Sequence, residues 1–291
     1  MDGLIRELKD LLTPGETFRL ARALHDSYHS FMPESEVWQM LKCALPSCIY
    51  GRIARNSESI VGHKLVNLIV MNFYPGEKVL KYYLARERVS VSDEVTAFEI
   101  KVRSSRLDLG RINGKSYALE IKTELDSLEK LSRQLCDYSH VFEYVTVVAH
   151  ESHYNKIPTT IPEHCGIRVY SVERGTVRFR ALRKPKHSPS LDMTTQVKSL
   201  SSRELEFVLR SIGSPSSSMS REERERVLKA NATPRQMNQL FKRALRRRFG
   251  SRWAFVIKHF EDIGPIDLQA FFASSAEPYW VYYKNSSSVF K

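Results

Sequence analysis

The sequence predicts an α/β protein whose sheet-forming core lies between two helical regions. Three observations lead to this class. Strand-like runs are confined to residues 95–183, whereas runs with the helical spacing of apolar residues fill the chain on both sides. A third observation is a helical stretch between the third and fourth strands, which is typical of α/β folds. The predicted division is a helical N-terminal region, an α/β core, a linker and a basic, mainly helical C-terminal region, with bounds 1–55, 56–183, 184–197 and 198–291.

The chain before residue 90 is predicted to be helical. Apolar residues recur there with the spacing of a helix face. The last two of these helices are separated by Pro75-Gly76, a pair that ends helices. The stretches are "DGLIRELKDLL", "ESEVWQMLKCAL", "SESIVGHKLVNLIVMNFY" and "EKVLKYYLARERV".

The pattern then changes to strands. "VTAFEIKV" (95–102), "RLDLGRI" (106–112) and "SYALEIKT" (116–123) are strand-like, and Asn113-Gly114 predicts a hairpin between the last two. Asp126, with Glu129 three residues later, resembles a capping box and predicts a helix from there to about residue 140. "YVTVVAH", "GIRVYSV" and "TVRFRAL" complete the strands.

A segment rich in Pro, Ser and His, "RKPKHSPSLDMTT", predicts the linker. Beyond it, helices are predicted for "SSRELEFVLRSI", "REERERVLKA" and "PRQMNQLFKRALRRRF", with "GSPSSSMS" as a flexible break between the first two.

The net charge of +12 is concentrated in one segment. Residues 184–258 contain seventeen Lys and Arg against six Asp and Glu, while the rest of the chain is almost neutral. A localised basic surplus favours a polyanionic partner, of which nucleic acid is the most common. A merely solvated helical face is the alternative.

The sequence favours the cytoplasm. The longest apolar runs are too short to span a bilayer, and the N-terminus has no hydrophobic signal core. Four cysteines without a Cys-x-x-Cys pair indicate buried free thiols in a reducing compartment. No membrane partner is therefore expected.

The hairpin carries charged residues on one face. Because side chains alternate along strands, Asp108 on the first strand can lie near Glu120 and Lys122 on the second. Two converging carboxylates raise each other's pKa unless a cation lies between them. A hard divalent ion such as Mg²⁺ fits such a site, and an adjacent ammonium can position water or stabilise a phosphate. The alternative is a solvated strand face with ordinary cross-strand ion pairs.

This order of an acidic residue, a hairpin, Glu-x-Lys and a helix resembles the PD-(D/E)XK nuclease superfamily. Asp108 and Glu120-Ile121-Lys122 match its core motif, with Leu107-Asp108 in place of the nominal Pro-Asp. Gln134 and Tyr138, four residues apart on one helix face, match a Gln-x-x-x-Tyr element found in several of its nucleases. Residues 95–150 are similar to a little-characterised group of stand-alone bacterial and phage proteins within that superfamily.

The resemblance implies a restriction-endonuclease-like core, with a central mixed sheet flanked by helices, and a Mg²⁺- or Mn²⁺-dependent deoxyribonuclease, with RNA as the second choice of substrate. It implies metal ligation by Glu99, Asp108, Glu120 and the Ile121 carbonyl. It implies catalytic roles for Asp108, Glu120, Lys122, Gln134 and Tyr138. An ion pair of Glu99 with Lys101 or Arg103 explains Glu99 equally simply. Because one motif serves one strand, cutting both strands requires a homodimer or sequential nicking.

The stretch "FKRALRRRFGSRW" interleaves basic and aromatic residues. One side of this helix is expected to pack through its aromatic and Leu residues, while the other side contacts phosphates without reading bases. The residues expected to bind nucleic acid are Lys242, Arg243, Arg246 and Arg247.

Two other functions stay open from the sequence. The first is a nuclease fold that binds nucleic acid, or regulates, without cutting it. The second is a module whose basic face meets an acidic protein.

Overall fold

The computed structural model describes residues 2–173, 176–214 and 219–283. Its internal contacts divide the chain into two compact units. Unit 1 comprises Met1–Val89, Val172–Val177 and Phe255–Lys291, and unit 2 comprises Ser90–Ser171 and Arg178–Ala254. The four regions predicted from the sequence follow other boundaries, and they stay a prediction.

Apart from the segment Val172–Val177, unit 1 is helical, as the sequence predicts for residues 1–55 and 77–89. Its α5 begins at Gly62 and not at residue 57, after the short 3-10 turn η1. The elements are α1 (Asp2–Leu11), α2 (Pro14–Ser27), α3 (Glu34–Ala44), α4 (Ser47–Ala54), η1 (Ser57–Ser59), α5 (Gly62–Phe73), α6 (Glu77–Arg86), η3 (Pro265–Asp267), α13 (Leu268–Ser274) and α14 (Pro278–Tyr282).

Polar side chains are buried at the centre of unit 1. The Asp267 carboxylate, fully buried, accepts hydrogen bonds through Oδ2 from the Tyr282 hydroxyl (2.7 Å), Asn67 Nδ2 (2.9 Å) and the Tyr28 hydroxyl (3.1 Å). His63 Nδ1 lies 2.7 Å from the same Tyr28 hydroxyl. This cluster ties N-terminal helices to the C-terminal segment of the unit.

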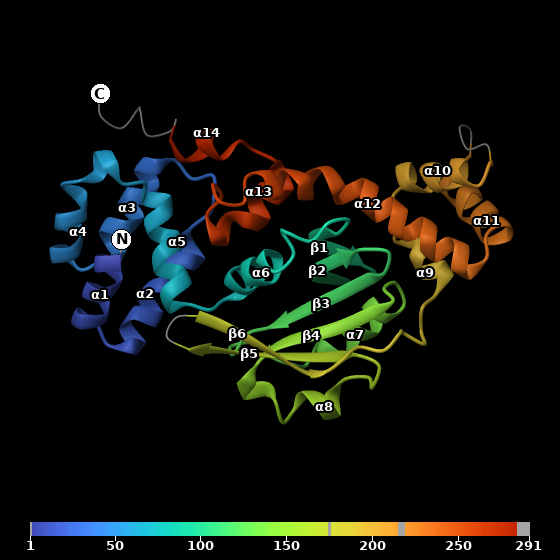
Figure 1. Cartoon of the computed structure of the whole chain (residues 1–291), viewed down its shortest axis with the longest axis horizontal. Coiled ribbons are helices and arrows are strands. Elements are labelled where there is room, and N and C mark those ends of the chain that lie inside the picture. Colours follow the sequence, from blue (N-terminus) through green and yellow to red (C-terminus); the bar gives the residue numbers. More distant parts are fainter. Residues whose placement is uncertain (1, 174–175, 215–218, 284–291) are drawn as a thin grey trace. The chain divides into compact units, whose positions relative to one another are not determined.

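Unit 2 contains a six-stranded mixed sheet in the order β1-β2-β3-β4-β5-β6 (Figure 1). The pairs β1–β2 and β2–β3 are antiparallel, whereas β3–β4 and β4–β5 are parallel. The predicted strands are confirmed, and Gly114, at φ +86°, occupies the predicted hairpin turn. The strands are β1 (Val95–Val102), β2 (Ser105–Ile112), β3 (Ser116–Lys122), β4 (Tyr144–His150), β5 (Gly166–Glu173) and β6 (Thr176–Arg183).

The helix α7 (Leu131–Ser139) joins β3 to β4 and packs on β2 and β4. The predicted start of this helix at Asp126 is wrong. The Asp126 carboxylate accepts hydrogen bonds from the backbone N–H and the hydroxyl of Thr123, both at 2.7 Å. It therefore closes a turn that points back along the chain and does not cap a helix.

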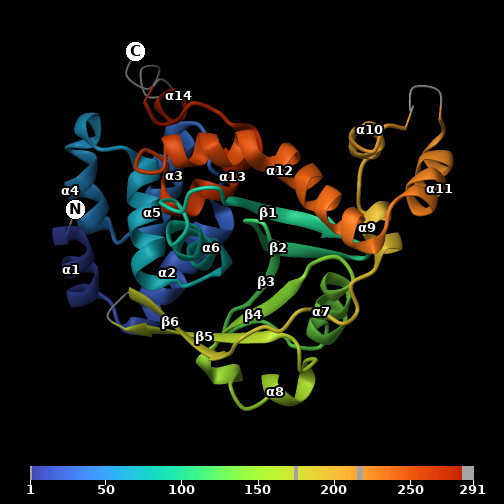
Figure 2. The ribbon, with the colours of Figure 1, turned by 45° about the vertical axis from the view of Figure 1, so that its right-hand side comes forward.

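The remaining helices of the sheet-containing unit are α8 (Ile157–Thr160), α9 (Met193–Lys198), α10 (Ser202–Ser211), α11 (Arg221–Asn231) and α12 (Pro234–Lys258), the last of which ends in unit 1. Helix α11 packs against α9 and α10 (Figure 2). The predicted break at 213–220 falls partly on residues 215–218, which lie outside the described residues.

Two segments differ from the sequence expectation. Helix α12 continues nine residues beyond the predicted end at residue 249. The segment expected to be a linker is packed, since Ser188 is buried and its hydroxyl donates to the Ser139 carbonyl at 2.7 Å. The expected packing side of α12 is confirmed, and its buried residues include Phe241, Leu245, Phe249 and Trp253.

The expectation of buried thiols is wrong for three cysteines. The thiols are free, but only that of Cys165 is buried, whereas the side chains of Cys43, Cys48 and Cys136 are exposed. Among the described helices, none has both the length and the apolar character that crossing a membrane requires.

Candidate active site

The hydrogen-bond ladder between β2 and β3 ends at the charged residues. Pairing runs from Ile112↔Ser116 to Leu109↔Leu119 and stops there, although both strands continue. Beyond that point β2 stays paired with β1 and β3 stays paired with β4. Past Leu109 each strand keeps its outer partner but no longer pairs with the other, and the side chains that follow border this opening of the ladder.

The carboxylate of Asp108 lies at this opening. Its Oδ2 accepts a hydrogen bond from the backbone N–H of Ile121 at 2.6 Å, in place of a ladder carbonyl. Asp108 is half-buried, and the register that ends at Leu109 puts it beside Glu120 on the next strand. The sequence prediction that these two carboxylates converge is therefore consistent with the strand register.

Glu120 and Lys122 form a buried ion pair at the C-terminal end of β3. Lys122 Nζ donates to Glu120 Oε1 at 3.0 Å, and the two residues are 9% and 2% exposed. They share one face because they are two residues apart on a strand. A buried charge pair is costly to desolvate, so its presence here calls for compensating contacts.

Helix α7 supplies one of those contacts. The hydroxyl of Tyr138 lies 2.8 Å from Glu120 Oε2 and 2.9 Å from the Arg106 carbonyl oxygen. Burial and the neighbouring Glu120 carboxylate raise the pKa of Tyr138 well above its usual value, so its hydroxyl stays a proton donor. Gln134, one turn earlier, also affects the pKa of Tyr138 through a side-chain hydrogen bond. The structure thus brings Tyr138 to the Glu120 carboxylate, with Gln134 next to Tyr138.

Glu99 completes the acidic group from the edge strand β1. Its partner is Arg106 on β2, whose Nε lies 2.5 Å from Glu99 Oε2, and not Lys101 or Arg103. The backbone of Glu99 is left-handed, with φ +56°, which is rare for a non-glycine residue within a strand. Strain of this kind is concentrated at functional sites.

The donor set fits a hard divalent cation. Carboxylate oxygens of Glu99 and Asp108 lie within 4.8 Å of each other. Ligands on opposite sides of one Mg²⁺ are roughly 4 Å apart, so a small movement brings both into its coordination shell. Glu120 accepts a hydrogen bond on each oxygen, from Lys122 and from Tyr138, and each oxygen has a second lone pair with which it would join them.

The basic side chains predicted on α12 are used in different ways. Lys242 Nζ pairs with Glu143 Oε1 at 2.9 Å, and Arg246 Nη1 donates to the Asp93 carbonyl at 2.5 Å. Arg243 and Arg247 are exposed and stack on the Phe207 ring at 5.9 and 4.7 Å. Two of the four are therefore engaged in contacts that hold the unit together.

One residue that supports the site was not predicted from the sequence. Asp137, buried next to Tyr138 on α7, accepts hydrogen bonds from the hydroxyls of Ser104 and Ser105 at 3.0 and 2.7 Å. It thereby fixes the turn that joins β1 to β2. Only its place beside the Gln-x-x-x-Tyr element could have drawn attention to it.

Comparison with known proteins identifies relatives among phage proteins. The family described as bacteriophage P4 protein cII matches residues 77–271, more than half of the chain. Protein cII of Enterobacteria phage P4 is 29% identical over 110 residues, which are 38% of this chain and 42% of that protein. The chain thus spans less than half the length of this curated relative, and no solved structure is significantly similar. The chain belongs to the bacteriophage P4 protein cII family.

Proposed function

We propose that the protein is a metal-dependent nuclease that hydrolyses phosphodiester bonds of nucleic acid, with DNA as its substrate. The observation that carries this proposal is the opening of the β2–β3 ladder, where Asp108, Glu120 and Lys122 lie beside Tyr138. Three antiparallel strands, a helix and a parallel fourth strand support a restriction-endonuclease-like core. The PD-(D/E)XK order of residues and this arrangement point to the same reaction class.

Glu99 and Asp108, joined by Glu120 and the Ile121 carbonyl, would hold Mg²⁺ or Mn²⁺. When bound, such an ion supplies a Lewis acid and lowers the pKa of water. Lys122 offers an ammonium that positions water or stabilises charge on the scissile phosphate. The protonated hydroxyl of Tyr138 keeps the Glu120 carboxylate oriented.

The proposed activity also implies a cell compartment and a requirement for double-strand cleavage. The reaction would take place in the cytoplasm of a bacterial or phage-infected cell. Double-strand cleavage would require a homodimer or two successive nicks, because the chain carries the motif once.

A second candidate is a nuclease fold that binds nucleic acid without cutting it. One observation favours it. The Glu120 carboxylate is satisfied by Lys122 on one oxygen and by Tyr138 on the other, so the pair is also explained as a buried structural ion pair. In that function the carboxylates would hold the sheet together and bind no metal.

Incubation with labelled single- and double-stranded DNA and RNA separates the two candidates. Each substrate is tested with Mg²⁺, with Mn²⁺ and with EDTA, and both binding and product formation are measured. The nuclease predicts metal-dependent fragments from DNA. Binding without fragments under every condition would reject the nuclease in favour of the second candidate.

A further inference from the structure

A cavity of about 570 Å³ in unit 2 has a lining that is half basic residues. Its charged residues are all cations, and no carboxylate is among the described residues that line it. The remaining lining comprises Ser and Thr residues and one leucine. The cations are Lys101, Arg103, Lys198, Arg221 and Arg248.

Three of the cations form ion pairs with carboxylates that are not part of the lining. Arg248 forms an ion pair with Glu204, Arg221 lies 2.9 Å from a Glu225 oxygen, and Arg103 Nε lies 3.5 Å from Asp137 Oδ1. Arg221 also donates to the carbonyl oxygens of Lys198 and Leu200 at 3.1 and 3.0 Å. Because these guanidinium groups are already ordered, an anion that binds them loses little further side-chain entropy.

The two lysines have no such partner. Lys101 and Lys198 are exposed, and within the described part of the chain no carboxylate pairs with either ammonium. Five cations face three carboxylates, so the cavity keeps a positive surplus. Helices α10 and α11 add to it, since Ser201 is the N-cap of the first and Arg221 the first residue of the second, and helix N-termini favour anions.

The cavity and the candidate active site share β1, and residues of α7 contact both of them. Lys101 follows Glu99 by two residues, so the two positions are roughly 7 Å apart along the edge strand. On α7, Asp137 supports the turn that carries Arg103, while its neighbour Tyr138 contacts Glu120. Lys101 of the cavity is therefore close to Glu99 of the candidate active site on the same strand.

We propose that this basic cavity binds backbone phosphate groups of a nucleic-acid strand and guides the strand to the carboxylates. The inference rests on the proposed function for its choice of nucleic acid as the ligand. The contacts are ionic, from ammonium and guanidinium groups to backbone phosphates, and phosphate contacts carry no sequence information, so the cavity anchors the strand regardless of sequence.

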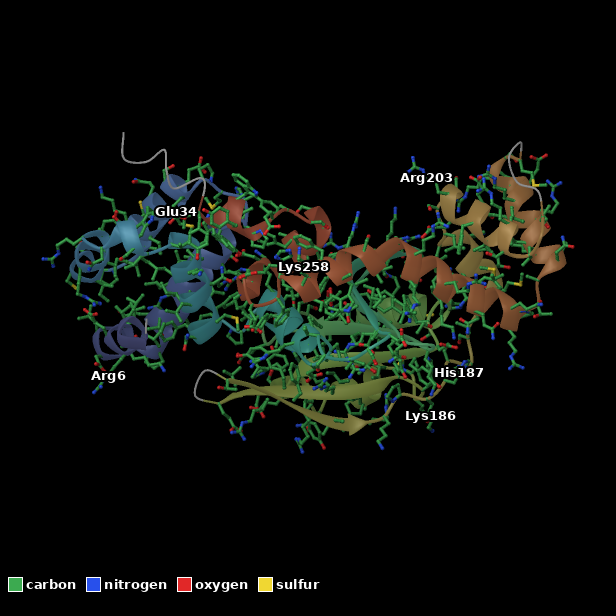
Figure 3. The ribbon with its side chains drawn as sticks, turned by 45° about the horizontal axis from the view of Figure 1, so that its top comes forward. Arg6, Glu34, Lys186, His187, Arg203 and Lys258 are labelled. Carbon is green, nitrogen blue, oxygen red and sulfur yellow. The ribbon has the colours of Figure 1, made fainter. Side chains whose placement is uncertain are left out.

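Salt-dependent binding tests the proposal without cleavage. Fluorescence anisotropy of a labelled single-stranded oligonucleotide is measured in EDTA at several salt concentrations. The test variant is Lys101→Ala/Lys198→Ala. The control is Lys186→Ala/Lys229→Ala, which removes two exposed lysines of the same unit outside the cavity; Lys186 lies on the segment after β6 (Figure 3).

The logarithm of the binding constant falls as the logarithm of the salt concentration rises, and each lost phosphate contact makes this slope shallower by roughly 0.7 for a single strand. The test variant should therefore bind more weakly than wild type, with a slope reduced by about 1.4, and the control should bind like wild type. Equal binding by test and control variants would overturn the proposal. So would displacement of the oligonucleotide by an equal concentration of ATP, since the ligand would then be a free nucleotide.

The outcome is independent of hydrolysis. If the cavity variant loses affinity as expected while wild type never cuts, the cavity stands and the nuclease proposal fails. If wild type cuts DNA while the cavity variant binds it normally, the cavity proposal fails alone.

Discussion

The buried pair of Glu120 and Lys122 gives the site its rigidity, and it makes single substitutions costly. In Lys122→Met the Glu120 carboxylate stays buried and loses its ammonium partner, while the Tyr138 hydroxyl remains in place. Leaving a buried charge unpaired costs about 3–5 kcal/mol. Urea denaturation should show a loss of this order in the free energy of unfolding.

The double variant Glu120→Gln/Lys122→Met is the matched control for that loss. It removes both charges, so it should be more stable than Lys122→Met while remaining unable to cut DNA. If the double variant is no more stable than Lys122→Met, the two side chains are not coupled as their 3.0 Å contact indicates.

The left-handed backbone of Glu99 predicts a conflict between stability and function. Replacement by Gly relieves the φ of +56°, whereas Ala removes the same carboxylate and keeps the strain. Glu99→Gly should therefore be more stable than Glu99→Ala by about 1 kcal/mol in urea denaturation, with metal binding weakened in both. Equal stability of the two variants would show that the backbone there is unstrained.

At the residue scale, the sequence was enough to find the charged residues of the site but not to predict their burial or their ion-pair partners. Strand alternation was enough to group Asp108 with Glu120 and Lys122. It could not show that Lys122 is buried against Glu120, or that Glu99 pairs with Arg106 across the ladder, because both depend on where α7 and the strand register place them.

At the element scale, the buried polar cluster makes the packing of α5 against η3 sensitive to pH. Burial lowers the pKa of His63, although Glu34 and Asp267 act in the opposite direction. The folded protein therefore keeps His63 neutral at a pH where the unfolded chain, with a histidine pKa of about 6.5, binds a proton. Stability due to this residue is complete above that pKa and decreases as the pH falls below it.

The free energy of unfolding should accordingly fall by about 1 kcal/mol more for wild type than for His63→Gln between roughly pH 7.5 and 5.5. Urea denaturation at both pH values measures the difference. Glu143 does not interfere with this measurement. Burial alone would raise the pKa of Glu143, but hydrogen bonds from Lys242, Asn238 and the Ser116 amide lower it, so its contribution to stability is lost only in more acidic solution. Identical pH dependence in wild type and variant would show that His63 does not make the stability of the protein depend on pH.

Element boundaries were predictable where local chemistry determines them. The Asn113-Gly114 turn fixes the hairpin, and alternating apolar residues fix the strands on either side. Asp126 misled because the same side chain can cap a helix or close a turn, and only the contact with Thr123 distinguishes the two. Helix α12 continues past Gly250, and Trp253 is buried like Phe241, Leu245 and Phe249, which precede it at intervals of four residues, so the apolar spacing in the sequence extends beyond the predicted end.

At the scale of the whole molecule, the sequence predicted an α/β chain with one basic segment, but not what that segment does. Lys242 and Arg246 lie in the predicted basic stretch and are engaged within the protein. The cavity instead combines Lys101 from the sheet with residues about a hundred positions later, such as Lys198. Residues so far apart are brought together by the fold alone.

Metal-dependent cleavage of labelled DNA by two matched variants tests the central claim most directly. Asp108→Asn removes a carboxylate from the candidate active site, and Asp126→Asn removes an exposed one eighteen positions later. We expect wild type and Asp126→Asn to cut DNA with Mg²⁺ or Mn²⁺ and not with EDTA, and Asp108→Asn to bind DNA without cutting it. Cleavage by Asp108→Asn at the wild-type rate, or no cleavage by wild type with either metal, would contradict the account.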